Sequence, residues 1–267
     1  MRADQSLVDI LLRLASSLSG PRRVPVLGGF LSGTSRQLVP PVTLIWAQIQ
    51  QSPAQGLWIR VNPRTGQNFQ KGIIEPAVQQ AIQQHLRDGM NFYDVGGNIG
   101  FFALMAARLV SHSGNVVSFE ADPEIASGLR ENLIYNKFME VLVEEKAVWS
   151  EPTTVSFVRV DRNISPDRGL GHVSTTNSSA SNLISVEVIS LDQYVLSHPA
   201  PDFLNCDVEG AEVAVFQGPE GLLREKHPIL LVQMHSSDNH RVLTQKFSQL
   251  GYPCRNLDEN HVLALPQ

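Results

Sequence analysis

The sequence predicts an α/β fold with a mostly parallel β-sheet. From Leu57 onward, short apolar runs alternate with helical stretches, which is the pattern of repeated β-α units. A glycine-rich turn connects the apolar run at residues 91–95 to a helix, as is typical of the ligand-binding end of such a sheet. With 267 residues, 42% of them apolar and 18% charged, the chain can form one large globular domain.

The alternation of apolar runs defines the expected elements in order. The core strands are expected at residues 91–95, 116–120, 141–145, 203–207 and 229–235, and the helices at 101–110, 123–136, 210–216 and 239–250. A strand at 57–61 and a helix at 75–86 precede them. Two extra strands, at 154–160 and 183–189, flank a loop at 161–182 that we expect to act as a lid. Strands at 252–255 and 261–265 predict a terminal antiparallel hairpin.

Residues 1–55 are expected to form a helical or irregular extension, and residues 56–267 the main domain. Apolar residues from Leu7 to Leu18 recur at helical spacing and predict an amphipathic helix that could dock on the domain or on a second subunit. We expect no transmembrane segment, because no run approaches about 20 apolar residues. The basic pair Arg22-Arg23 follows the apolar stretch, unlike in a secretory signal, so we expect a cytoplasmic protein.

Charge and cysteine content exclude further classes of protein. A net charge of −5 disfavours binding to nucleic acid, which usually requires a basic excess. Cys206 and Cys254 are the two cysteines of the chain, and they form no C-x-x-C pair. A disulfide framework or a structural zinc site is therefore not expected.

The spacing of the glycine-rich turn distinguishes between ligands. Gly96, Asn98 and Gly100 occupy alternate positions, whereas a dinucleotide fingerprint places its third glycine three residues after the second. Asp94 ends the strand before the turn and would repel a pyrophosphate, but it could pair with an ammonium group. S-adenosylmethionine carries an ammonium and a sulfonium, and it therefore suits this site.

A second acidic residue, Glu120, ends the next core strand. A carboxylate at this position can accept hydrogen bonds from both hydroxyls of a ribose. As alternatives, Asp94 could cap the following helix and Glu120 could be a solvated strand end. Their positions on consecutive strand ends favour adenosine binding, because parallel sheets bind ligands at the carboxyl ends of their strands.

Four ordered motifs carry a resemblance to a known family. They are Asp94-Val-Gly-Gly-Asn-Ile-Gly100, Phe119-Glu-Ala-Asp-Pro123, Leu191-Asp192 and Asp207-Val-Glu-Gly-Ala-Glu212, and Gly72-Ile-Ile-Glu-Pro76 precedes them. Together they resemble the FkbM-type family of S-adenosylmethionine-dependent methyltransferases. The resemblance implies the class I methyltransferase fold, a Rossmann-like seven-stranded sheet whose last strand is antiparallel.

The resemblance also implies the residues that bind S-adenosylmethionine. The methionine part would lie among Asp94, Gly96, Asn98 and Gly100, the ribose on Glu120, and the adenine near Ala121, Glu145 and Lys146. Two positions differ from the family pattern, since Asn205 stands where Lys is usual and Gln233 where Glu is usual. Both changes remove a charge near the expected acceptor pocket, not near the cofactor.

Acidic residues and a histidine end the fourth and fifth core strands. Asp207 and Glu209 lie on the same side of an extended chain, because side chains alternate along a strand. We expect Asp207 to line the cleft beside cofactor and acceptor, and Glu209 to orient the acceptor, although Glu209 could cap the next helix instead. His235 is the candidate base for an alcohol acceptor, with a packed or solvated side chain as the alternative.

The predicted function is methyl transfer from S-adenosylmethionine to a hydroxyl oxygen of a sugar, glycolipid or secondary metabolite. The hydroxyl class comes from the family resemblance. No metal is expected, although a magnesium site built from Asp207 with Asp238-Asn239 is a less favoured route. Asn205 and Gln233 support a non-catalytic binding or scaffold protein as an alternative. An NAD-dependent oxidoreductase is disfavoured by the glycine spacing.

Overall fold

A computed structural model describes residues 42–151, 154–159, 172–174 and 183–267 of the chain. The helix expected at residues 7–18 and most of the lid expected at residues 161–182 lie outside these ranges. Among the described helices, none has both the length and the hydropathy required to cross a bilayer. Cys206, which is buried, and Cys254, which is half-buried, are both free thiols, as predicted.

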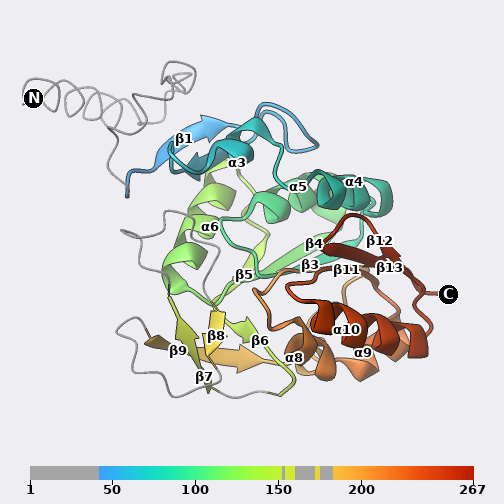
Figure 1. Cartoon of the computed structure of the whole chain (residues 1–267). Helices are drawn as coiled ribbons and strands as arrows, with labels where there is room; N and C mark the ends of the chain where they lie inside the picture. The colour runs from blue at the N-terminus through green and yellow to red at the C-terminus, as the bar shows by residue number, and fades with distance from the viewer. Residues whose placement is uncertain (1–41, 152–153, 160–171, 175–182) are drawn as a thin grey trace, which may run out of the picture.

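A seven-stranded sheet runs through the middle of the molecule in the order β12-β13-β11-β10-β3-β4-β5 (Figure 1). The bounds of these strands are β3 Asn91–Val95, β4 Asn115–Phe119, β5 Leu142–Glu144, β10 Phe203–Cys206, β11 Ile229–Gln233, β12 Cys254–Asn256 and β13 His261–Ala264. Strands β5, β4, β3, β10 and β11 pair in parallel, and β13 pairs antiparallel with both β11 and β12. The predicted class I methyltransferase fold, with its antiparallel last strand, is confirmed.

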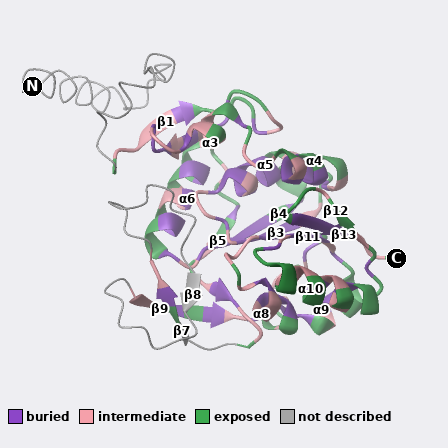
Figure 2. Cartoon of the chain, in the orientation of Figure 1, coloured by how far each residue is buried: buried purple, intermediate pink, exposed green. Residues whose placement is uncertain are grey.

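Helices cover both faces of this sheet (Figure 1). One layer contains α4 (Pro76–His85), α5 (Phe101–Val110) and α6 (Pro123–Tyr135), and the other contains α8 (Glu212–Gln217), α9 (Glu220–Lys226) and α10 (Ser237–Gln249). Alternate residues of β3 enter the two layers, because Phe92 packs with the first and Tyr93 and Val95 pack with the second. The sheet is therefore the buried layer of the molecule (Figure 2).

Helix boundaries follow local capping chemistry. Helix α6 begins at Pro123 because the Asp122 side chain accepts hydrogen bonds from the first backbone N–H groups of the helix. Helix α10 begins two residues earlier than predicted, since Ser236 caps it. Helix α8 begins two residues later than predicted, because Glu209 and Gly210 both have positive φ angles, of 50° and 96°.

A β-hairpin packs beside the first helical layer. Strand β1 (Ile45–Gln48) pairs antiparallel with β2 (Trp58–Val61), and the short helix α3 (Gln67–Lys71) follows. This pairing joins residues on either side of the domain boundary expected between residues 55 and 56. Ile49 and Ala54 are buried in the same cluster as α4 and α5. Residues 45–55 thus pack as part of the main domain.

A smaller sheet is inserted between β5 and β10 along the chain, and α7 (Leu191–Tyr194) follows it. Its strand order is β6-β9-β7-β8, with bounds β6 Ala147–Val148, β7 Thr154–Val158, β8 His172–Ser174 and β9 Leu183–Ile189. Strands β7 and β9 correspond to the two extra strands predicted, and they pair antiparallel. Strand β8 lies within the loop expected at residues 161–182, so part of that segment pairs with β7.

Candidate functional site

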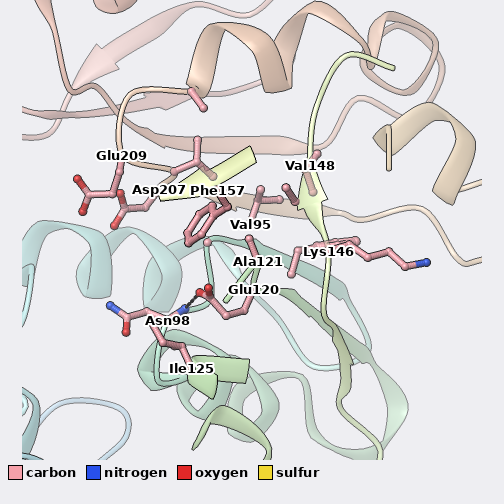
Figure 3. Close-up of a pocket in the computed structure, with 15 residues that line it drawn as sticks. Val95, Asn98, Glu120, Ala121, Ile125, Lys146, Val148, Phe157, Asp207 and Glu209 are labelled. Atoms are coloured by element: carbon pink, nitrogen blue, oxygen red, sulfur yellow. Dashed lines mark hydrogen bonds between the residues drawn. The ribbon is translucent and has the colours of Figure 1, made fainter. Parts of the chain in front are cut away.

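A cleft of about 660 Å³, including its open mouth, lies at the carboxyl ends of β3, β4 and β10 (Figure 3). This is the edge of a parallel sheet where ligands bind. Its apolar walls are formed by Val95, Phe119, Ile125, Val148 and Phe157. Its ionisable side chains are those of Glu120, Lys146, Asp207 and Glu209.

The structure brings together most of the site residues predicted from the sequence. Gly96, Asn98, Glu120, Ala121, Lys146, Asp207 and Glu209 all line the cleft. The described lining does not include Asp94, Gly100, Glu145 or His235, although His235 contacts the lining residues Asp207 and Glu209. The Glu145 carboxylate instead pairs with Arg130, and its side chain is 41% exposed. A Cβ atom at Gly100 would meet the Leu129 side chain, so this glycine permits packing of two helices.

Gly96 joins the two halves of the cleft floor. It has a φ of 90°, and a Cβ atom there would lie 1.8 Å from the carbonyl oxygen of Asp207. The backbone N–H of Asp207 also donates to the carbonyl oxygen of Val95, at 2.9 Å. The loop after β3 and the loop after β10 are therefore in direct backbone contact, which only glycine at position 96 permits.

Glu120 is fixed by backbone N–H groups on both sides. Its Oε2 accepts from the backbone N–H of Asn98 at 2.8 Å, and its Oε1 accepts from that of Asp122 at 2.9 Å (Figure 3 shows the first bond). Burial raises its pKa to about 7, against the lowering effect of these two hydrogen bonds. Each carboxylate oxygen keeps a further lone pair, so a ligand hydroxyl can still bind.

Asp94 lies beneath the glycine loop with 1% of its surface exposed. Its carboxylate accepts hydrogen bonds from Nδ2 of Asn205 at 2.9 Å and from Oγ of Ser118 at 3.5 Å. Burial raises its pKa to about 6. Asn205, one of the two departures from the family pattern, is therefore the hydrogen-bond donor that satisfies a buried acid.

His235 lies among three carboxylates at one end of the cleft. This end, which carries Asp207 and Glu209, is called the acceptor end. Its Nδ1 lies 2.6 Å from Oε1 of Glu212, and its Nε2 lies 3.3 Å from Oε2 of Glu209 and 3.6 Å from Oδ1 of Asp207. Glu212 is fully buried, and it also accepts from the backbone N–H of Gly210 at 2.9 Å. The second carboxylate oxygen of Glu212 accepts a hydrogen bond from the side chain of Asn239, in helix α10, at 2.6 Å.

These contacts change the expected protonation of the site. Hydrogen bonding to Glu209 and Glu212 raises the pKa of His235 to about 10, although burial acts in the opposite direction. Burial, and then the charge of Glu75, raises the pKa of Asp207 to about 7. The surrounding carboxylates therefore favour the charged form of the imidazole, and a general-base role for His235, which requires the neutral form, stays a prediction.

The magnesium set considered from the sequence does not assemble. The Asp238 side chain is 85% exposed and pairs with Arg241, while Asn239 donates to Glu212 instead of facing the cleft. Gln233, the second departure from the family pattern, lies beside Asp207, and with its amide nitrogen turned toward that residue it donates to both carboxylate oxygens, at 3.1 and 3.0 Å. In the described part of the chain, the residues that can share one metal ion are Asp207, Glu209 and His235.

Sequence analysis did not assign the apolar lining residues to the site, and it also missed the contact of Glu212 with His235. Phe157 reaches the cleft from the inserted sheet, and nothing in its local pattern indicates this contact. Glu212 ends the motif Asp207-Val-Glu-Gly-Ala-Glu212, so the sequence offered a signal for it. An acid in the first turn of a helix usually interacts with the helix dipole, and this ordinary role conceals its contact with His235.

Comparisons with known proteins show the family of this chain. A family model described as the methyltransferase FkbM domain matches residues 94–254. Over 56 residues, the chain is 41% identical to a protein-L-isoaspartate O-methyltransferase of Methanothrix thermoacetophila. That match covers 21% of this chain and 27% of that protein, so the chain spans about a quarter of the relative's length.

Solved structures with a similar arrangement are distant in sequence. A methyltransferase FkbM from Methylobacillus flagellatus KT has a TM-score of 0.48 and 16% identity, over 72% of this chain and 51% of that one. A precorrin-6y C5,15-methyltransferase from Geobacter metallireducens GS-15 has a TM-score of 0.46 and 14% identity, over 74% and 92%. Fibrillarin of Aeropyrum pernix, in complex with natively bound S-adenosyl-L-methionine, has a TM-score of 0.41 and 10% identity, over 67% of each chain.

Proposed function

This chain belongs to the FkbM family of methyltransferases, with S-adenosylmethionine as its methyl donor, and we propose that it methylates a hydroxyl oxygen. The acceptor class we propose is a sugar, a glycolipid or a secondary metabolite. The observation that carries the proposal is the acidic cluster around His235, which lies beside a cleft with apolar walls and with Glu120 at its other end.

The residues of the cleft fit the chemistry of this donor. Glu120 presents two carboxylate oxygens that can accept hydrogen bonds from ribose hydroxyls, and the apolar walls suit a purine ring. Asp207 and Glu209 provide negative charge for a cationic sulfonium and ammonium. Lys146 is the one cation of the described lining, and Figure 3 shows its ammonium directed away from these acids, where it pairs with Glu187 at 3.1 Å. A pyrophosphate would instead be repelled by Asp207 and Glu209, which disfavours a dinucleotide.

When bound, S-adenosylmethionine supplies an electrophilic methyl group. The chain's own contribution to such a displacement is to hold the acceptor oxygen in line, because positioning accounts for much of the rate. Gly96 leaves the cleft floor free of a side chain, and Asp207 and Glu209 flank the acceptor end. Their carboxylate oxygens can accept the hydrogen bond of the acceptor hydroxyl, and one of them can take the proton that the hydroxyl loses on methylation.

A hydroxyl group suits this cluster better than other acceptors. It donates one hydrogen bond and accepts others, which matches two carboxylates beside Nε2 of His235. A carboxylate acceptor would be repelled by Asp207, Glu209 and Glu212, and a protonated amine would have no lone pair to attack with. Cytoplasmic location and oligomerisation through the N-terminal segment stay predictions from the sequence.

Binding and transfer can be tested separately. Differential scanning calorimetry with S-adenosylmethionine, S-adenosylhomocysteine, NAD and NADP should show stabilisation by the first two alone, of about 2.7 kcal/mol at a hundredfold excess over the dissociation constant. Transfer of a radiolabelled methyl group should then be measured on a panel of alcohols, amines and carboxylates. Labelled ethers support the proposal, whereas labelled esters or amines contradict it. Binding without transfer to any compound would favour a non-catalytic protein.

A further inference from the structure

We infer that Asp207, Glu209 and His235 form a binding site for one divalent cation of the Mn²⁺ and Mg²⁺ class, at the acceptor end of the cleft. These three side chains come from the ends of the neighbouring parallel strands β10 and β11. Each offers one ligand atom, and the three atoms lie within 4.8 Å of one another. Two carboxylate oxygens and one imidazole nitrogen are a ligand set that hard divalent cations accept.

The distances between the donor atoms fit a shared cation. Ligand atoms bound at about 2.1 Å on one face of an octahedron lie roughly 3.0 Å apart, and in a tetrahedron they lie roughly 3.4 Å apart. Here Nε2 of His235 lies 3.3 Å from Oε2 of Glu209 and 3.6 Å from Oδ1 of Asp207. The side chains of His235, Glu209 and Asp207 are 21%, 28% and 30% exposed, and the two acids line the cleft, so a cation there would be accessible from it.

A second observation outside the cluster supports a ligand role for His235. Metal-binding histidines almost always donate the other ring N–H to a carboxylate, which fixes the tautomer and directs the free nitrogen at the metal. Nδ1 of His235 lies 2.6 Å from Oε1 of the fully buried Glu212, so Nε2 faces the two cleft carboxylates. Asn239 and the backbone N–H of Gly210 hold Glu212 in turn.

Asp207 is oriented in a comparable way. The amide of Gln233 lies 3.1 and 3.0 Å from its two oxygens, which fixes the plane of the carboxylate while leaving lone pairs toward the cleft. A glutamate at position 233 would place another negative charge there without any donor. Of the three candidate ligands, two therefore have a partner behind them that orients the ligand atom.

A second histidine shows what an ordinary ion-pair arrangement looks like in this protein. His261 also contacts two acids, with Nδ1 2.8 Å from Asp258 and Nε2 3.6 Å from Glu75. Its side chain is only 8% exposed, and among the described residues its cluster provides no third ligand atom. The His235 cluster differs in having two carboxylates on the same ring nitrogen and an opening to the cleft.

A bound cation would also assist the reaction at the acceptor end. This consequence depends on the proposed methyl transfer. A cation beside the cleft can bind an acceptor oxygen and lower the pKa of its hydroxyl, so that the oxygen is held as a better nucleophile. Open positions on one cation favour an acceptor with two neighbouring oxygens, such as a vicinal diol. The cation site itself can be tested without any acceptor.

The test is a titration of the full chain, after treatment with EDTA, with Mn²⁺ followed by electron paramagnetic resonance of the free ion. We expect one Mn²⁺ per chain. His235→Ala and the isosteric Glu209→Gln should each weaken binding at least tenfold. Asp238→Asn removes a nearby but exposed acid and should leave the affinity unchanged. Circular dichroism confirms the fold of each variant, and calorimetry with S-adenosylmethionine measures donor binding independently.

Each outcome has a defined meaning. Absence of saturable Mn²⁺ binding, or equal affinity in the wild type, His235→Ala and Glu209→Gln, overturns the cation site and leaves His235 as part of an ion-pair network. An equal loss in Asp238→Asn also overturns it, because it places the ion at the surface of α10. Donor binding without Mn²⁺ binding contradicts this inference alone. Mn²⁺ binding without donor binding contradicts the proposed function alone.

Discussion

The two ends of the cleft hold their acids by different means. At the cofactor end, Glu120 is fixed by two backbone N–H groups, from Asn98 and Asp122. At the acceptor end, Asp207 and Glu209 meet the side chain of His235, and the supporting groups are side chains as well. Backbone donors are set by the fold and cannot rotate away, whereas ion pairs between side chains can exchange partners. The cofactor end is therefore organised by the loops, and the acceptor end by charge.

The largest effect is expected at the junction between the two ends. Gly96→Ala should destabilise the protein by more than about 3 kcal/mol, or prevent folding, because its Cβ would lie 1.8 Å from the Asp207 carbonyl oxygen. Gly210→Ala is the matched control, since Gly210 has a φ of 96° but no atom within 4 Å of its Cβ position. It should cost roughly 1 kcal/mol from backbone strain. Urea denaturation measures both, and equal losses would show that the close contact is unimportant.

The next effect tests the cofactor end alone. Glu120→Ala should weaken S-adenosylmethionine binding by at least about tenfold, because hydrogen bonds to charged groups contribute about 1.5–3 kcal/mol each. Glu145→Ala is the control, since Glu145 is an acid of the same predicted set that instead pairs with Arg130 outside the described lining. Isothermal titration calorimetry should show no comparable loss there. A similar loss in both variants would contradict the assignment of the ribose site.

Glu120 should also give protein stability and S-adenosylmethionine binding opposite dependences on pH. The pKa of Glu120 is raised from 4.5 to about 7 in the folded protein, so its ionised form costs folding free energy above pH 7. That cost disappears as the pH falls through 7 toward 4.5, and this residue makes the free protein more stable at pH 6 than at pH 8. Donor affinity should instead fall by up to about tenfold at pH 6, because the carboxylate becomes protonated.

Calorimetric titrations at pH 8 and pH 6, with urea denaturation of the free protein at both values, check this pair of predictions. Glu120→Gln is the reference, because it has no titrating group at this position. Its donor affinity should change less between the two pH values than that of the wild type. A wild-type affinity that is constant over this range would remove Glu120 from the binding site.

The smallest effect concerns the departure from the family pattern at the acceptor end. Gln233→Glu should destabilise the protein by about 1 kcal/mol, because it replaces a donor to Asp207 with a like charge. Gln80→Glu makes the same change on an exposed position of α4 and should lie within about 0.5 kcal/mol of the wild type. Denaturation at pH 7.5 distinguishes them. Increased stability of Gln233→Glu would show that the acceptor end lacks negative charge instead of having an excess.

What could be predicted from the sequence is the part of the site that local chain geometry decides. The strand, glycine loop and helix from residue 91 to residue 110 were predicted with their boundaries, because turn and helix signals lie within a few residues of one another. Glu120 was placed at the cleft by the same reasoning, since the end of a parallel strand is fixed by its apolar run. The structure places Glu120 in the lining of the cleft.

What could not be predicted depends on contacts between distant segments. Asp94 is buried because Asn205, 111 residues away, donates to it from the neighbouring strand. The side chain of Glu145 is on the outer surface because Arg130 of helix α6 attracts it there. His235 was predicted beside the cleft, but its charge state depends on hydrogen bonds to Glu209 and to Glu212, which begins helix α8. Sequence spacing carries no information on these pairs until the sheet order is known.

The separate origin of the cleft walls has a consequence for how such a protein can diversify. The acids and the glycine floor come from the central sheet, where Gly96 and Asp207 constrain each other, whereas Phe157 comes from the inserted sheet. Substitutions in the floor disturb folding, donor binding and chemistry together, so few of them are tolerated. Substitutions in the inserted sheet change the shape of one wall and leave the floor intact. Divergence toward new acceptors is therefore expected to accumulate in the insert, while the floor stays constant among relatives with different substrates.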